Sequence, residues 1–261
     1  MNEYIVSLIK NDYISQLRRM FPNSQMIRNT EKVQKCKILR NSQLGVGANA
    51  DIENNKLEYG DYADECTLFH ELDHIRKGTK VREYQVDAEP FLTAQNEVRY
   101  DTPRRGIFFD EATSEWLAIT MFRNSPHFEP SIDMPKINQR SFYSNNLKIL
   151  SAISNALNIP VSEFIEMIDS KHYEGNKRID ALFSMRSDNK ISFSEIESAL
   201  DDYETAHYIE YQCSLGNMEG ATGLSNETKG RSQQSFKKAL NKIENIARNR
   251  SPSICDVDNS I

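Results

Sequence analysis

The stretch that most constrains this chain is TLFHELDH at residues 67–74, because it carries two histidines and a glutamate in the spacing H-E-x-x-H. In a helix, residues four apart lie one turn apart on the same face, so His70 and His74 can converge on one ion. Neutral imidazole is a good zinc ligand, and Glu71 lies on the flank of the same turn, where it can accept a proton from water. The chain has only five histidines in 261 residues, which disfavours a chance arrangement on a surface helix.

A second predicted helix supplies what such a site lacks. A catalytic zinc site usually takes three protein ligands and leaves a fourth position open, so two histidines need one more. The segment DEATSEWLA at residues 110–118 is predicted to be helical, with Glu111 and Glu115 on one face. Glu111 is the candidate third ligand. Glu115 is expected to accept a hydrogen bond from the free ring nitrogen of a ligand imidazole.

The two segments together resemble a known family. H-E-x-x-H followed by a helix with E-A-T-S-E at 111–115 is similar to the gluzincins, zinc peptidases whose third metal ligand is a glutamate, over roughly residues 45–165. The resemblance implies a Zn²⁺ ion bound by His70, His74 and Glu111, with Glu71 as the general base and Glu115 beside a ligand imidazole. It also implies a mainly helical C-terminal half beneath the cleft.

Gluzincins commonly stabilise the oxyanion with a tyrosine from that helical half. Tyr143, in the apolar and predicted helical segment at 141–159, is the candidate here, and a packing role for its ring is the alternative reading. His127 and His172 are further candidates for the same task.

Two other resemblances keep the third ligand open. H-E-x-D-H, with Asp73, also resembles the peptide deformylases, whose third ligand is a cysteine in an upstream E-G-C-L-S segment; this chain lacks that segment and has only Cys36 and Cys66 upstream. VDAEPFLTA at 86–94 resembles a segment of the ImmA-type peptidases. That resemblance makes three more carboxylates possible ligands: Glu83, Asp87 and Glu89.

Composition and charge narrow the possible partners and cellular location of the protein. Net charge is −6, which argues against a nucleic-acid partner. No apolar run is long enough for a transmembrane helix, and the N-terminus lacks the pattern of a secretory signal, so a cytoplasmic location is expected, with non-classical export left open. The four cysteines form no C-x-x-C pair and are expected to be reduced thiols.

We expect an α+β, zincin-like fold. Residues 1–78 should form an N-terminal helix, a small sheet and the metal helix ending near Gly78, with a strand, an Asn54-Asn55 turn and a second strand at 45–59. Residues 79–212 should form a mainly helical lobe that completes a catalytic domain at 1–212. Residues 213–261, rich in Gly, Ser and Asn at their start, are expected to be a flexible linker and a peripheral basic helix.

The expected reaction is zinc-dependent hydrolysis of a peptide or protein substrate, with Glu71 as general base. Two alternatives stay open: another zinc amide hydrolase with deformylase-like chemistry, and a degenerate zincin that binds or senses a partner. The sequence leaves the substrate preference and the oligomeric state undetermined.

Overall fold

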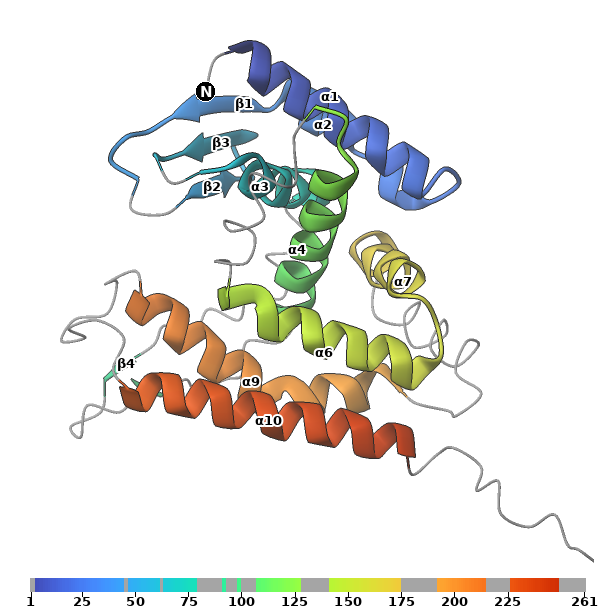
Figure 1. Cartoon of the computed structure of the whole chain (residues 1–261), viewed down its shortest axis with the longest axis vertical. Helices are drawn as coiled ribbons and strands as arrows, with labels where there is room; N and C mark the ends of the chain where they lie inside the picture. The colour runs from blue at the N-terminus through green and yellow to red at the C-terminus, as the bar shows by residue number, and fades with distance from the viewer. Residues whose placement is uncertain are drawn as a thin grey trace, which may run out of the picture.

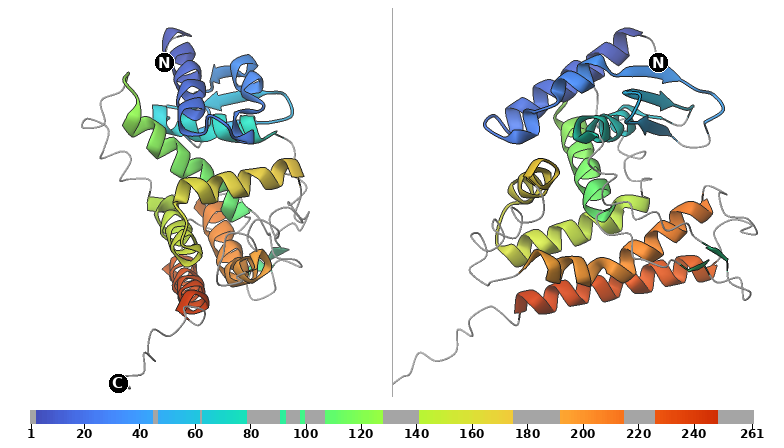
Figure 2. Two further views of the ribbon diagram at one scale, coloured as in Figure 1. Left: turned by 90° about the vertical axis from the view of Figure 1, so that its right-hand side faces the viewer. Right: turned by 180° about the vertical axis from the view of Figure 1, so that it is seen from behind.

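A computed structural model describes residues 3–44, 47–61, 63–78, 91–92, 98–99, 107–127, 141–174, 192–214 and 226–248 of the chain. Over these ranges the protein is a mixed α and β structure that is mostly helical with one small three-stranded sheet, as expected. Figure 1 and Figure 2 show the sheet and the first helices at one end, the last helices at the other, and α4 running between them.

The N-terminal part consists of helices packed around the sheet. α1 (Glu3–Met20), η1 (Gln25–Ile27) and α2 (Thr30–Lys35) precede β1 (Lys37–Arg40), β2 (Ala48–Asp51) and β3 (Lys56–Tyr59). β3 lies in the centre, parallel to β1 and antiparallel to β2. The expected strand, turn and strand are β2 and β3, and Asn55 in their turn has a φ of 49°, a left-handed conformation that asparagine tolerates well.

The predicted metal helix is α3 (Glu65–Lys77). It begins at Asp64, whose side chain accepts a hydrogen bond from the Thr67 backbone N–H at 2.7 Å, and it ends at Gly78, where φ is 75°. α3 packs against β2, β3, α1, α2 and α4. Because it has neighbours on all these sides, its polar residues are buried as well as its apolar ones.

The remaining helices are α4 (Ile107–Asn124), α6 (Ser141–Leu157), α7 (Val161–Glu174), α9 (Phe193–Ser214) and α10 (Asn226–Arg248), and two short strands, β4 (Phe91–Leu92) and β5 (Val98–Arg99), pair antiparallel. α4 packs against both α3 and α6, so it belongs to both halves of the molecule. Within the described ranges, no helix combines the length and the apolar character that crossing a bilayer requires.

The C-terminal region differs from the expectation in two respects. α9 extends to Ser214, past the expected domain boundary at 212. α10 is not peripheral: it packs against α9 and α6 (Figure 1), and Phe236, Ala239 and Ile243 are buried in the same core as the rest of the protein. The physical reason is that α9 and α6 present an apolar surface that covers the stripe of α10. Most of the expected linker lies outside the described residues.

Candidate metal centre

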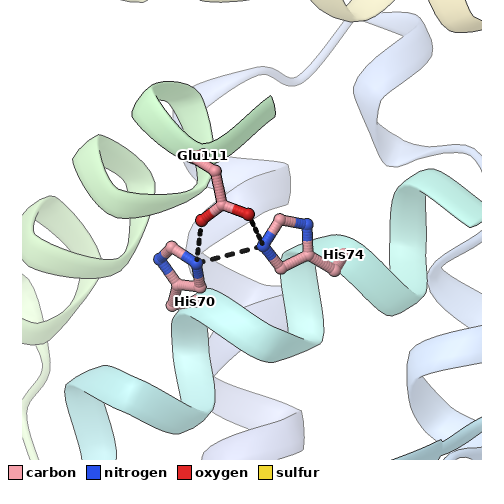
Figure 3. A group of neighbouring side chains, drawn as sticks. All are labelled: His70, His74 and Glu111. Carbon is pink, nitrogen blue, oxygen red and sulfur yellow. Dashed lines mark hydrogen bonds and ion pairs between the residues drawn. The ribbon is translucent and has the colours of Figure 1, made fainter. Parts of the chain in front are cut away.

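The packing of α4 on α3 brings the three expected ligand side chains together (Figure 3). Nε2 of His70 and Nε2 of His74 lie 3.0 Å apart. Glu111 approaches them from α4, with Oε2 at 3.2 Å from His70 Nε2 and Oε1 at 3.7 Å from His74 Nε2. One ligand atom from each residue lies within 4.8 Å of the others.

These separations suit a zinc ion. Zn–N and Zn–O bonds of about 2.0–2.1 Å in tetrahedral geometry place two ligand atoms about 3.3 Å apart. The separations of 3.0, 3.2 and 3.7 Å scatter around that value. The two imidazoles are buried, whereas the Glu111 side chain is 29% exposed to solvent.

The Nδ1 atom of each imidazole, on the opposite side of the ring from Nε2, contacts a carboxylate on α4. His70 Nδ1 lies 2.9 Å from Glu115 Oε2, and the Glu115 side chain is fully buried. His74 Nδ1 lies 3.0 Å from Asp110 Oδ2. A carboxylate at Nδ1 keeps the proton on that nitrogen and leaves Nε2 free for a metal. Both rings are therefore fixed in the tautomer and orientation that a metal site needs.

Glu115 occupies its expected position, whereas Asp110 was not among the predicted site residues. Asp110 lies about 100° around the helix from Glu111 and so outside the face shared by Glu111 and Glu115. The sequence feature that could have indicated Asp110 is the consecutive pair Asp110-Glu111. Two adjacent carboxylates on one helix can contact both ring nitrogens of one histidine on a facing helix, as they do at His74.

The carboxylates also control the protonation of the two rings. Burial lowers the pKa of His70, but hydrogen bonds to Glu111 and Glu115 outweigh burial and raise that pKa to about 10. Burial likewise lowers the pKa of His74, and the charges of Asp110 and Glu111 reverse the effect, so the net pKa is raised. Without a metal, His70 holds a second ring proton at neutral pH, and the raised pKa of His74 favours protonation of that ring as well.

We therefore expect zinc binding at pH 7 to release at least about one proton per ion, since a metal requires the neutral ring nitrogen. The apparent zinc affinity should rise as pH increases from 6 towards 9, because fewer protons then compete. Calorimetric titration with zinc in buffers of different ionisation enthalpy measures the release. Glu115→Gln should release fewer protons, and a binding enthalpy that is the same in every buffer would contradict the expectation.

Next to the site lies a network of buried charges centred on Asp73. Asp73 is fully buried and pairs with Lys77 at 2.8 Å and Arg76 at 2.9 Å. Lys77 also contacts Asp110 at 2.9 Å, which links this network to His74. The packing of α1 and α4 on α3 buries Asp73.

The charges in and around the site do not balance. Two cations, Arg76 and Lys77, face five carboxylates, which are Asp73, Asp110, Glu111, Glu115 and Asp169. Either protons on the two imidazoles or a divalent cation between them would offset two of the three excess negative charges. The donor set and its charge are thus suited to Zn²⁺.

Two further expected residues lie on α3 or on the neighbouring helix α6. The Tyr143 ring on α6 has its centroid 5.1 Å from that of His70, so the candidate oxyanion stabiliser is next to the site. Glu71, the candidate base, is half-buried on α3 directly after His70.

The other candidates fall elsewhere. Cys36 and Cys66 are buried in the hydrophobic core, and the ligand cluster found among the described residues contains no cysteine. His127 is exposed at the end of the α4 region. Three alternative third ligands, Glu83, Asp87 and Glu89, lie outside the described residues, and so does the side chain of His172.

One histidine near the site was not anticipated. His207 on α9 stacks on Tyr203, with ring centroids 5.3 Å apart, and lies close enough to Glu111 to feel its charge. Burial lowers the pKa of His207 to about 4, against the opposing charge of Glu111. The imidazole is therefore neutral at pH 7 and does not compete with a cation for Glu111.

Comparison with known proteins places the chain in no family: no protein-family model, curated protein or solved structure matches it.

Proposed function

We propose that this protein is a zinc-dependent hydrolase of the zincin type that cleaves peptide bonds. The observation that carries the proposal is the convergence of His70, His74 and Glu111 at zinc-like separations, with Glu115 and Asp110 holding the outer nitrogens of the two imidazoles. Structural and catalytic zinc sites both use such donors, but a set of three with a partly exposed carboxylate is typical of a catalytic site.

The residues around the centre have the chemistry that peptide hydrolysis requires. A zinc ion bound there would supply a Lewis acid that polarises the carbonyl and acidifies water. Glu71 would accept the proton of the attacking water and deliver it to the leaving amine. Tyr143, whose ring lies beside His70, would donate a hydrogen bond from its hydroxyl to the developing oxyanion.

The third ligand favours a peptidase of the gluzincin type over deformylase-like chemistry. A deformylase needs a thiolate, whereas the described cluster offers the Glu111 carboxylate, and both upstream cysteines lie in the hydrophobic core. A degenerate zincin that only binds a partner would retain the same ligands, so turnover distinguishes it from an enzyme.

The proposal is tested by the metal content and zinc affinity of Glu111→Ala. Loss of this ligand should weaken zinc binding more than roughly 100-fold, beyond the 10–100-fold typical of a lost partner of a ligand imidazole. Glu115→Ala serves as the comparison and should fall within that smaller range. Cys66→Ser should bind zinc as the wild type does. Wild-type affinity in Glu111→Ala, or loss of zinc only in an Asp87 or Cys66 variant, would overturn the ligand assignment.

A further inference from the structure

The start of α4 is held by a side chain from a distant part of the chain. The Glu204 carboxylate on α9 accepts a hydrogen bond from the backbone N–H of Phe108 at 3.0 Å, and both residues are buried. Phe108 is the second residue of α4, so its N–H has no acceptor within the helix. Glu204 provides that acceptor, and its negative charge is also favourable at a helix N-terminus.

This contact lies within one helical turn of the metal centre. Asp110 and Glu111 follow Phe108 by two and three residues. A helix whose first N–H groups lose their acceptor frays at that end, and fraying of α4 would displace both carboxylates. The position of the third ligand therefore depends on a residue that is not itself in the ligand cluster of His70, His74 and Glu111.

Contacts of Tyr203 fix α9 against three other helices, α4, α6 and α10. The Tyr203 ring lies 6.1 Å from that of Phe108 and 6.1 Å from that of Phe236 on α10, and the Tyr203 hydroxyl donates to Asn146 on α6. Tyr203 and Glu204 thus place α9 against the first turn of α4 at Phe108.

We propose that Glu204 is a positioning residue for the metal centre, which holds Glu111 in place by capping α4 and so makes zinc affinity depend on the helices α9 and α10. The inference rests on the proposed function in that it takes Glu111 as a zinc ligand. It adds that the C-terminal helices, although they supply none of the three ligands, are part of what makes the site.

The test compares zinc dissociation constants of the full-length chain with three changes at Glu204. Glu204→Ala removes the acceptor and should weaken zinc binding roughly 10-fold, within the range of a lost cap or a lost outer partner. Glu204→Asp keeps the charge but is one methylene shorter, and should lose nearly as much. Glu204→Gln keeps an oxygen at the same distance and should restore most of the affinity.

Asp202→Ala is the matched control. Asp202 lies on the same helix, and its exposed carboxylate pairs with Lys238 of α10. The control removes the same charge and an α9–α10 contact but leaves the cap, so it should bind zinc as the wild type does. A second readout is hydrogen exchange of the Phe108 amide, which should be faster in Glu204→Ala and Glu204→Asp than in Asp202→Ala.

The outcomes separate the two proposals. If the wild type takes up no zinc, the proposed function fails and this inference falls with it. If the wild type binds zinc and a folded Glu204→Ala binds it equally tightly, only the inference is overturned. If Glu204→Ala does not fold, Glu204→Asp and Glu204→Gln decide: equal wild-type affinity in both overturns the inference, and weak binding in Asp with recovery in Gln supports it.

Discussion

Replacement of Glu71 by glutamine is expected to reduce peptide hydrolysis by roughly 10²–10⁴-fold, the range typical of general-base loss, while the protein retains its zinc. Glutamine has the size of glutamate and can still hydrogen-bond water, but it cannot accept a proton. His70, His74 and Glu111 are unchanged in this variant, and Glu71 is not in their cluster. The chemical step should therefore fail without loss of the metal.

The measurement pairs turnover of fluorescently labelled casein and a quenched peptide library with zinc content by elemental analysis. Glu65→Gln is the matched control, because it makes the same chemical change on the same helix, more than one turn before His70. It should turn over as the wild type does. Undiminished hydrolysis in Glu71→Gln would exclude Glu71 as the base. A wild type that binds zinc and cleaves nothing would favour the degenerate zincin.

The elements predicted well from the sequence are those with local signals. Gly78 ends α3 because a left-handed residue is needed there, and Asn55 makes the turn between β2 and β3 for a similar reason. The helical segment predicted at 141–159 is α6, and Pro160, which has no backbone N–H, separates it from α7. These features depend on a few neighbouring residues, which a single sequence contains.

The burial of α10 could not be predicted in the same way. Its apolar stripe, with Phe236 and Ile243, is visible in the sequence, but the sequence does not show whether another part of the chain covers it. α9 and α6 do so, and together they convert a basic amphipathic helix into part of the core. Burial of a stripe depends on tertiary contacts, and those are not a local property.

The candidate site also combines features that local spacing predicts with features that depend on tertiary contacts. Spacing within one helix placed His70 beside His74, and spacing within another placed Glu111 and Glu115 on one face. The contact of Asp110 with His74 depends on how α4 is rotated against α3, which no spacing within either helix determines. A contact of this kind, between residues on two different helices, could therefore not be predicted from spacing in the sequence.

The second large effect is expected at Arg76. This side chain is fully buried, donates to both oxygens of Asp169 on α7 at 2.6 and 3.0 Å, and also donates to Asp73 at 2.9 Å and to the backbone carbonyl of Met26 at 3.2 Å. It thus ties α3 to α7 and η1. Removal of one partner from a buried ion pair leaves the other charged and unpaired, which usually costs about 3–5 kcal/mol.

Arg76→Met keeps much of the volume but removes the charge, so its free energy of unfolding should fall by about 3–5 kcal/mol, measured by urea denaturation at pH 7. Arg40→Met is the matched control, because Arg40 pairs with Asp61 on the surface and its loss should change little. The double variant Arg76→Met/Asp169→Leu should recover part of the loss, since it also removes an unpaired buried carboxylate. A single variant as stable as the control would show that the network contributes little to folding.

The pH dependence of the metal-free protein provides an independent check of the same network. Burial raises the pKa of Asp73, but the charges of Arg76 and Lys77 outweigh burial and hold that pKa well below its usual range. Because the folded-state pKa is depressed, Asp73 contributes stability above the unfolded value of about 3.9, and that contribution is lost as pH falls below it. Arg76→Met removes one of the two cations, so Asp73 should take up its proton at a higher pH, and acid unfolding followed by circular dichroism should begin at a higher pH than in Arg40→Met. Coincident acid transitions for the two variants would mean that Lys77 alone sets the charge state of Asp73.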